Sequence, residues 1–147
     1  MTDKNILVVD DDKIILNSLC EFLSLEEFQT RGAETLKQAT AELLKQNYCL
    51  VITDINLPDG DGFDLLDIIR KDHPQTVVIV ITGYGTIESA VKAIKRGAYD
   101  YLTKPIIDDE LRLAVERAVN QQTLMSENES LRLQLEQKYS LENIVSH

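Results

Sequence analysis

The sequence has few of the residues that mark secreted or metal-thiolate proteins. Its 147 residues include no tryptophan and only two cysteines, Cys20 and Cys49, which lie in apolar stretches without metal-ligand spacing. We expect both thiols to be buried and reduced, as in cytosolic proteins. No apolar run approaches the roughly 20 residues that span a bilayer, and the N-terminus lacks the pattern of a secretory signal. These absences predict a cytoplasmic protein that makes no membrane contact.

Positive charge is also scarce, with 15 Lys and Arg against 25 Asp and Glu and a formal net charge of −10. Neutralising nucleic-acid phosphates requires a basic face, so this balance disfavours direct DNA binding by the segment. Clustered carboxylates instead suit hard cations such as Mg²⁺ or Ca²⁺. Apolar residues make up 44% of the chain, which is enough for the core of one ordinary domain with a short appendage.

Short β-rich runs alternate with helical patterns along the first 120 residues. Strands are expected at 5–9, 28–31, 50–53, 77–81 and 99–103. Helices are expected at 13–26, from residue 35, at 63–71, at 86–96 and from the acids 108–110 onward. Residues 57–62, L-P-D-G-D-G, are expected to form a loop. This order predicts an α/β fold with a parallel, doubly wound sheet.

Local signals refine the helix boundaries. A Thr-x-x-Gln capping box at Thr35 and Gln38 is expected to start the second helix. The apolar face of that helix is expected to hold Leu36, Ala39, Leu43 and Leu44. Gly97 is expected to close the helix at 86–96.

Polar residues follow four of the five expected strands. Asp10 and Asp11 follow the first, Asp54 ends the third, Thr82 follows the fourth and Lys104 follows the fifth. Right-handed crossovers bring the carboxyl ends of parallel strands to one edge of the sheet, where the sites of such folds lie. The sequence therefore predicts that three carboxylates, a hydroxyl and an ammonium meet there. Asp12, next along the chain, has the alternative role of a helix cap.

This set of groups indicates phosphoryl chemistry. Three close carboxylates repel one another unless a cation such as Mg²⁺ lies among them. An aspartate can act as a nucleophile that forms an acyl phosphate, and Lys104 can pair with a phosphoryl oxygen. Taken singly, each residue is an ordinary cap, turn or surface residue. Their convergence on one edge favours a phosphoryl site.

Four motifs together resemble the receiver domain of two-component response regulators over about residues 4–120. They are V-V-D-D-D from residue 8, D-I-N-L-P-D-G-D-G from residue 54, I-T-G from residue 81 and K-P at 104–105. The resemblance implies a flavodoxin-like, five-stranded sheet. It also implies that Asp54 accepts a phosphoryl group from a sensor histidine kinase. The chain would then catalyse only its own phosphorylation and dephosphorylation, and would not be an enzyme.

The same resemblance assigns the other site residues. It implies a Mg²⁺ ion held by Asp10, Asp11, Asp54 and the backbone carbonyl of Asn56, with Asp11 the better candidate for direct contact. It implies that Lys104 binds the phosphoryl group.

A second group of residues would transmit the signal. Thr82 is the implied switch hydroxyl, and Tyr101 matches the aromatic switch position. The Lys104–Pro105 bond is expected to be cis, and residues 86–101 with the following helix would form the output surface.

A narrower resemblance involves residues 82–105, T-G-Y-G-T-I-E-S-A-V-K-A-I-K-R-G-A-Y-D-Y-L-T-K-P, which are similar to receivers of the nitrogen-regulation type. Those receivers control sigma-54-dependent transcription activators. The stretch 137–146 is similar to the point where their linker meets an AAA+ ATPase domain. The resemblance implies a receiver domain at 1–120 and a linker at 121–147. Contacts with DNA and sigma-54 RNA polymerase would belong to domains absent from this chain.

The helical pattern from residue 111 to about 138 contains no Gly or Pro. One heptad seam holds Leu111, Val115, Ala118, Gln122 and Met125, and another holds Leu124, Asn128, Leu131 and Leu135. The second seam predicts a parallel homodimer that phosphorylation rearranges. In the alternative, the first half of the helix packs on the receiver and the rest is solvated.

Two other functions compete with the phosphoacceptor. Asp10-x-Asp12 after a strand is similar to the nucleophile motif of haloacid-dehalogenase-like phosphatases, but Ile14 stands where that family has Thr or Val. The other alternative is a receiver fold that dimerises without being phosphorylated. Such modules usually lose the acceptor, the acidic pair or the lysine, and all of these are present here.

Overall fold

The computed structural model describes residues 4–83 and 85–145, with side chains to residue 135. Five strands form one parallel sheet in the order β2-β1-β3-β6-β7. These strands are β1 (Asn5–Val9), β2 (Gln29–Ala33), β3 (Leu50–Asp54), β6 (Val77–Thr82) and β7 (Asp100–Thr103). The predicted fold, a doubly wound five-stranded parallel sheet, is confirmed.

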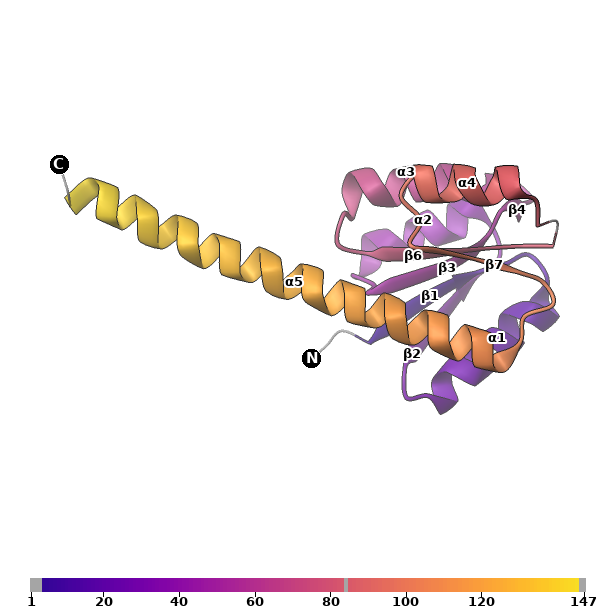
Figure 1. Ribbon diagram of the computed structural model, residues 1–147. Helices are drawn as coiled ribbons and strands as arrows, with labels where there is room; N and C mark the ends of the chain where they lie inside the picture. The colour runs from indigo at the N-terminus through magenta and orange to yellow at the C-terminus, as the bar shows by residue number, and fades with distance from the viewer. Residues whose placement is uncertain (1–3, 84, 146–147) are drawn as a thin grey trace.

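Helices cover both faces of this sheet, as Figure 1 shows. The helices α2 (Leu36–Lys45), α3 (Gly62–Asp72) and α4 (Ile87–Lys95) lie on one face, and α1 (Lys13–Leu25) and α5 (Asp108–Val145) lie on the other. Because successive strand residues point to opposite faces, β1, β3 and β6 each contribute side chains to two hydrophobic clusters. Leu7, Val51 and Val78 belong to one buried cluster. Ile6, Ile52 and Ile79 belong to the other.

Two sequence predictions missed the position or presence of strands. The second strand was expected at 28–31 but covers Gln29–Ala33 at the sheet edge, where only Ala33 is buried. One buried residue leaves no periodic signal to fix the boundary. The expected loop at 57–62 contains an antiparallel hairpin of β4 (Asn56–Leu57) and β5 (Gly60–Asp61). Strands of two residues are too short to produce an alternating pattern.

The start of α2 differs from the predicted capping box. Thr35 Oγ1 accepts from the backbone N–H of Gln38 at 3.0 Å, as predicted. The Gln38 side chain, however, accepts from the backbone N–H of Glu34 at 2.8 Å, so the box is not closed. Leu44 was wrongly assigned to the buried face, since it is 86% exposed. It lies one position beyond Leu43, and a step of 100° per residue turns it to solvent.

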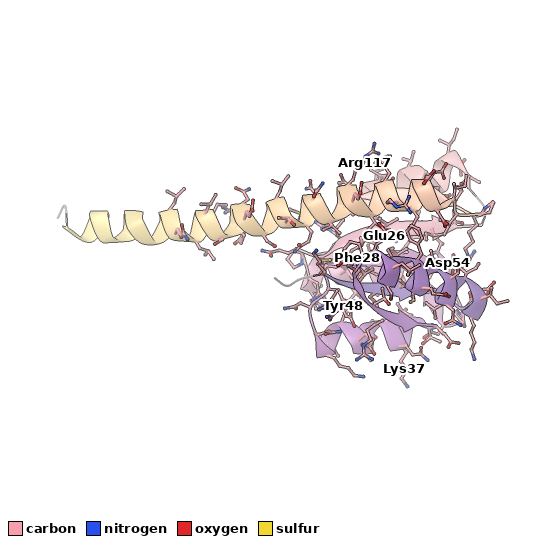
Figure 2. The ribbon with its side chains drawn as sticks, turned by 90° about the horizontal axis from the view of Figure 1, so that it is seen from below. Glu26, Phe28, Lys37, Tyr48, Asp54 and Arg117 are labelled. Atoms are coloured by element: carbon pink, nitrogen blue, oxygen red, sulfur yellow. The ribbon has the colours of Figure 1, made fainter. Side chains whose placement is uncertain are left out.

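The first turns of α5 pack on the sheet, and the rest of the helix extends away from the domain (Figure 1). Leu111, Val115 and Ala118 are buried in the cluster shared with α1. Figure 2 shows the side chains of the distal part standing out from the helix without contact to the body of the domain. The first predicted seam is therefore a contact with the domain. Among the described residues, no helix has the length and apolar character needed to cross a bilayer.

Candidate functional site

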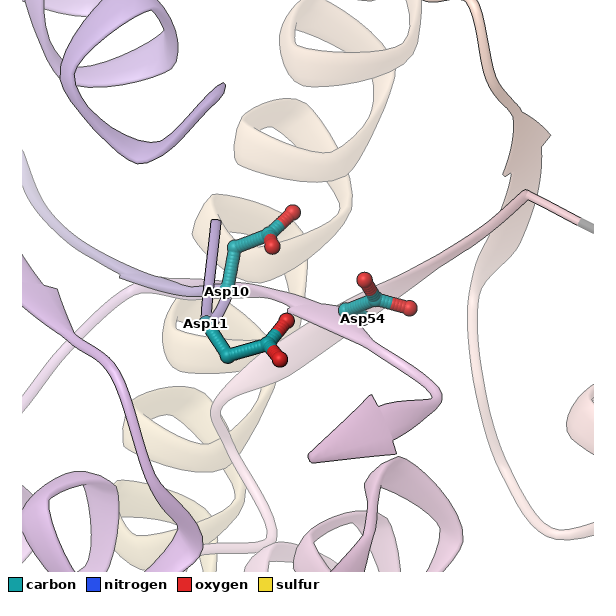
Figure 3. Close-up of side chains that lie close together, drawn as sticks. All are labelled: Asp10, Asp11 and Asp54. Carbon is teal, nitrogen blue, oxygen red and sulfur yellow. The ribbon is translucent and has the colours of Figure 1, made fainter. Parts of the chain in front are cut away.

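The carboxyl edge of the sheet gathers the acidic residues that the sequence singled out. Asp10 and Asp11 follow β1, and Asp54 ends β3. Figure 3 shows the three carboxylates side by side, and one oxygen of each lies within 4.8 Å of the others. Asp10 and Asp54 are buried, whereas Asp11 is exposed. Asp12 lies outside this group and caps α1, accepting from the backbone N–H groups of Ile14 and Ile15 at 3.0 and 3.4 Å, which confirms its alternative role.

Lys104 supplies a positive charge to this cluster. Its Nζ lies 2.7 Å from Asp54 Oδ2 and 3.2 Å from Asp10 Oδ2. Burial alone would lower the pKa of Lys104, but hydrogen bonds to Asp54 and Asp10 outweigh it, and the pKa is raised. The lysine therefore stays protonated and bridges the two buried carboxylates.

Asp10 is the most buried acid of the site, at 2% exposure. Burial raises the pKa of its carboxyl group. The backbone N–H of Asp12, which donates to Asp10 Oδ1 at 2.9 Å, and Lys104 both act in the opposite direction. The raised pKa means that these partners offset the cost of burying the charge only in part.

The segment after Asp54, expected from the sequence to be a loop that follows the implied metal ligand Asn56, shapes the site. The backbone N–H of Asn56 donates to Asp54 Oδ1 at 3.2 Å. A Cβ added to Gly62 would lie 2.4 Å from the Asp54 carbonyl oxygen, so no larger residue fits there. The two glycines of D-G-D-G were the only sequence signal of this close approach.

The donor set of this edge fits a hard divalent cation. Carboxylate oxygens from three residues converge within the span of one coordination sphere. No sulfur or imidazole ligand accompanies them in the described cluster. This chemistry suits a hard cation such as Mg²⁺ and not a metal that prefers sulfur or imidazole ligands, such as Zn²⁺.

The remaining predicted residues lie on β6, on β7 and just after β7. Thr82 is buried at 2% exposure and ends β6, and its carbonyl accepts from the backbone N–H of Lys104 at 2.8 Å. Tyr101 is half-buried, and its hydroxyl lies 2.8 Å from Ser89 Oγ on α4. The Lys104–Pro105 peptide bond is cis. Ser89 was not singled out in the sequence, because a serine in the first turn of a helix reads as an ordinary cap.

Comparison with known proteins identifies this arrangement. The family model described as response regulator receiver domain matches residues 6–116. The chain belongs to the response regulator receiver family. A receiver domain is a phosphoacceptor signalling module, and this membership argues against the haloacid-dehalogenase alternative.

Relatives of this receiver domain point to one type of regulator. It is 40% identical over 119 residues to the response regulator protein PilR of Pseudomonas aeruginosa, covering 81% of this chain and 27% of that protein. It is 40% identical over 139 residues to the nitrogen assimilation regulatory protein NtrX of Azorhizobium caulinodans, covering 93% and 30%. The resemblance to receivers of the nitrogen-regulation type is thereby confirmed. The chain spans less than a third of the length of these relatives.

Solved structures show the same fold. The beryllofluoride-activated NtrC4 receiver domain dimer is 39% identical, with a TM-score of 0.78, over 81% of this chain and 98% of that chain. NtrX from Brucella abortus in complex with ADP is 43% identical, with a TM-score of 0.81, over 87% of this chain and 29% of that chain.

Proposed function

We propose that this receiver domain accepts a phosphoryl group on Asp54 from a histidine kinase, in a Mg²⁺-dependent reaction, and passes the change to its linker helix. The observation that carries the proposal is the acidic cluster with Lys104 Nζ 2.7 Å from Asp54 Oδ2. A buried carboxylate nucleophile that lies beside a lysine and two further carboxylates is suited to a transferring phosphoryl group.

Phosphoryl transfer would proceed by attack of an Asp54 carboxylate oxygen on phosphorus. The phosphorus–nitrogen bond of the phosphohistidine donor breaks as the new bond forms, and its electron pair leaves on the imidazole nitrogen. Lys104 exchanges its bond with Asp54 for one with a phosphoryl oxygen. Asp10, Asp11, Asp54 and the backbone carbonyl of Asn56 would hold Mg²⁺, which when bound neutralises charge on the phosphoryl oxygens.

Thr82 and Tyr101 are the proposed switch. The Thr82 hydroxyl would donate to a phosphoryl oxygen, and Tyr101 would move into the space that this side chain leaves. That movement would break the 2.8 Å contact between the Tyr101 hydroxyl and Ser89 Oγ. Ser89 forms a capping box with Thr86 at the start of α4, so the change would reach this helix. Ile87 on α4 is 84% exposed and available to an output partner.

The linker is the proposed route to an effector. Leu124, Leu131 and Leu135 are 61%, 57% and 53% exposed along one predicted seam with Asn128. A parallel homodimer through this seam would cover them, and the NtrC4 receiver is described as a dimer. We place a sigma-54-type activator, with its ATPase and DNA-binding domains, beyond the linker. The tail similarity at 137–146 lies outside the residues whose side chains the structure describes, and the cytoplasmic location stays a prediction.

Beryllofluoride, which mimics the acyl phosphate, tests the proposal when added together with Mg²⁺. We expect a changed NMR environment of Tyr101 and a changed sedimentation coefficient in the unmodified chain, and neither change in Asp54→Asn. A chain that does not bind beryllofluoride would be an interaction module instead. Binding without any change in assembly would retain the phosphoacceptor and exclude dimer rearrangement as the output.

A further inference from the structure

The hairpin that follows the phosphoacceptor is attached to the site at its base. The backbone N–H of Asn56 in β4 donates to Asp54 Oδ1 at 3.2 Å, and that of Gly62 after β5 donates to the Ile55 carbonyl at 2.7 Å. These bonds fix where the hairpin begins and ends. The pairing of Leu57 with Gly60 closes its turn, Pro58 and Asp59, but does not fix the turn relative to the rest of the domain.

The turn is held by α2, through a side chain distant from it in sequence. Asp59 Oδ1 accepts from the backbone N–H of Leu36 at 2.7 Å, and Oδ2 accepts from that of Lys37 at 3.0 Å. Both N–H groups belong to the first turn of α2, where helical partners are missing. The two bonds lower the pKa of Asp59, with Lys37 adding a smaller electrostatic effect. One carboxylate thus joins the hairpin to the helix with both of its oxygens.

Close packing accompanies these hydrogen bonds. A Cβ added to Gly60 would lie 2.7 Å from Leu36 Cδ2, so the hairpin backbone sits directly on that side chain. Leu57 on the same hairpin is buried in the cluster against which Leu36 packs. The hairpin is therefore positioned by α2 on one side and by Asp54 on the other.

We propose that Asp59 is a positioning residue for the metal site, which ties the hairpin that carries Asn56 to α2. The inference rests on the proposed function, in which the Asn56 backbone carbonyl is a Mg²⁺ ligand. A ligand on a two-strand hairpin is held only as well as the hairpin, and ligands fixed in advance bind metal more tightly. If the tie of the hairpin to α2 favours Mg²⁺ binding, thermodynamic linkage requires that bound Mg²⁺ also favours the tie. Mg²⁺ should therefore strengthen the hydrogen bonds of Asp59 to α2.

The chain offers a matched control in Thr35. Its hydroxyl caps the same first turn of α2, accepting from Gln38 N–H at 3.0 Å, but it belongs to α2 and not to the hairpin. Asp59→Ala removes two bonds to the first turn of α2 together with the hairpin tie. Thr35→Ala removes one such bond and leaves the tie. Asp59→Asn loses the charge but keeps one acceptor oxygen.

The experiment is a titration of the full chain with MgCl₂, followed by the NMR shifts of the Asp10, Asp11 and Asp54 amides. We expect Asp59→Ala to weaken Mg²⁺ binding about tenfold, Asp59→Asn to weaken it less, and Thr35→Ala to leave it unchanged. In the unmodified chain, Mg²⁺ should also slow hydrogen exchange at the Leu36 and Lys37 amides.

Two results would overturn the inference while leaving the proposed function intact. Equal Mg²⁺ affinity of Asp59→Ala and the unmodified chain would show that the tie does not position the ligand. Equal weakening by Asp59→Ala and Thr35→Ala would assign the effect to helix stability. If the unmodified chain shows no Mg²⁺ shifts at Asp10, Asp11 and Asp54, the proposed function itself fails, and this inference with it.

Discussion

Two acids at the carboxyl edge of the sheet, Asp10 and Asp54, are buried to nearly the same degree as the hydrophobic core, yet burial acts on the two regions in opposite directions. Asp10 is 2% exposed and Leu111 is 1% exposed. Removing Leu111 from water stabilises the fold, because apolar surface is transferred out of solvent. Removing the Asp10 carboxylate from water opposes folding unless its charge is compensated. The core therefore supplies the stability that allows the domain to keep a charged site at its edge.

Lys104 offsets part of the destabilisation that burial causes at the acidic edge. It contacts both buried carboxylates, yet the pKa of Asp10 stays raised, because burial is the largest influence on that group. Part of the cost of burying the Asp10 charge therefore stays uncompensated, and a bound divalent cation would reduce it. A carboxyl group with a raised pKa among other charged groups is typical of a functional site.

The largest expected change in stability comes from a substitution in the hydrophobic core. Leu111→Ala should lower the free energy of unfolding by about 3 kcal/mol, since it leaves a cavity between α5 and the sheet. Leu133→Ala on the same helix is the control, because Leu133 is 52% exposed, and it should change stability by less than about 0.5 kcal/mol. Urea denaturation at low protein concentration measures both. Equal losses would mean that the two halves of α5 do not differ in packing.

The next largest change in stability is expected from removing the positive charge of Lys104. Lys104→Met should cost about 2 kcal/mol in the absence of Mg²⁺, since it leaves two buried carboxylates without their partner. Added Mg²⁺ should restore part of the loss. The control is Lys95→Met, which removes an exposed lysine from α4 and should be nearly neutral. If Lys104→Met matches the control, Lys104 does not stabilise the acidic cluster. If the loss occurs but Mg²⁺ restores none of it, the cluster does not bind the ion.

Much of this comparison could be predicted from the sequence, because strongly periodic segments report burial directly. The runs at 50–53 and 77–81 are continuous and apolar except for Thr53, and both are central strands buried on both faces. Asp10, Asp54 and Lys104 could be placed together because each lies at or just after the end of an expected strand. The parallel topology then brings the strand ends to one edge.

The parts that could not be predicted depend on contacts between distant segments. The tie from Asp59 to α2 joins residues 22 and 23 positions apart, and no local pattern encodes it. The contact between Tyr101 and Ser89 joins β7 to α4 in the same way. The edge strand β2 begins one residue and ends two residues later than expected, because a single buried residue, Ala33, leaves it without periodicity. Local patterns fix which face of an element is buried, whereas polar side chains decide how neighbouring elements are joined.

The smallest expected effect concerns Asp10. It tests directly whether burial of this carboxylate lowers or raises the stability of the fold. A carboxyl group whose folded pKa is raised contributes stability that is complete below its unfolded value, near 3.8, and is lost as the pH rises through the folded value. Asp10→Asn keeps an acceptor for Asp12 N–H but carries no charge. In the absence of Mg²⁺ it should therefore be more stable than the unmodified chain at pH 7, by about 1 kcal/mol. The advantage should shrink as the pH falls towards 3.8.

Urea denaturation between pH 3.5 and pH 7 measures this difference, with Asp72→Asn as the control because Asp72 is exposed at the end of α3. The control should change stability by less than about 0.5 kcal/mol. Mg²⁺ should reverse the order, stabilising the unmodified chain but not Asp10→Asn, because binding to the folded state alone adds to stability. If instead Asp10→Asn is the less stable protein at pH 7 without Mg²⁺, Lys104 and the Asp12 N–H more than compensate the buried charge. The acidic edge would then stabilise the fold as the core does, and its difference from the core would lie in chemistry alone.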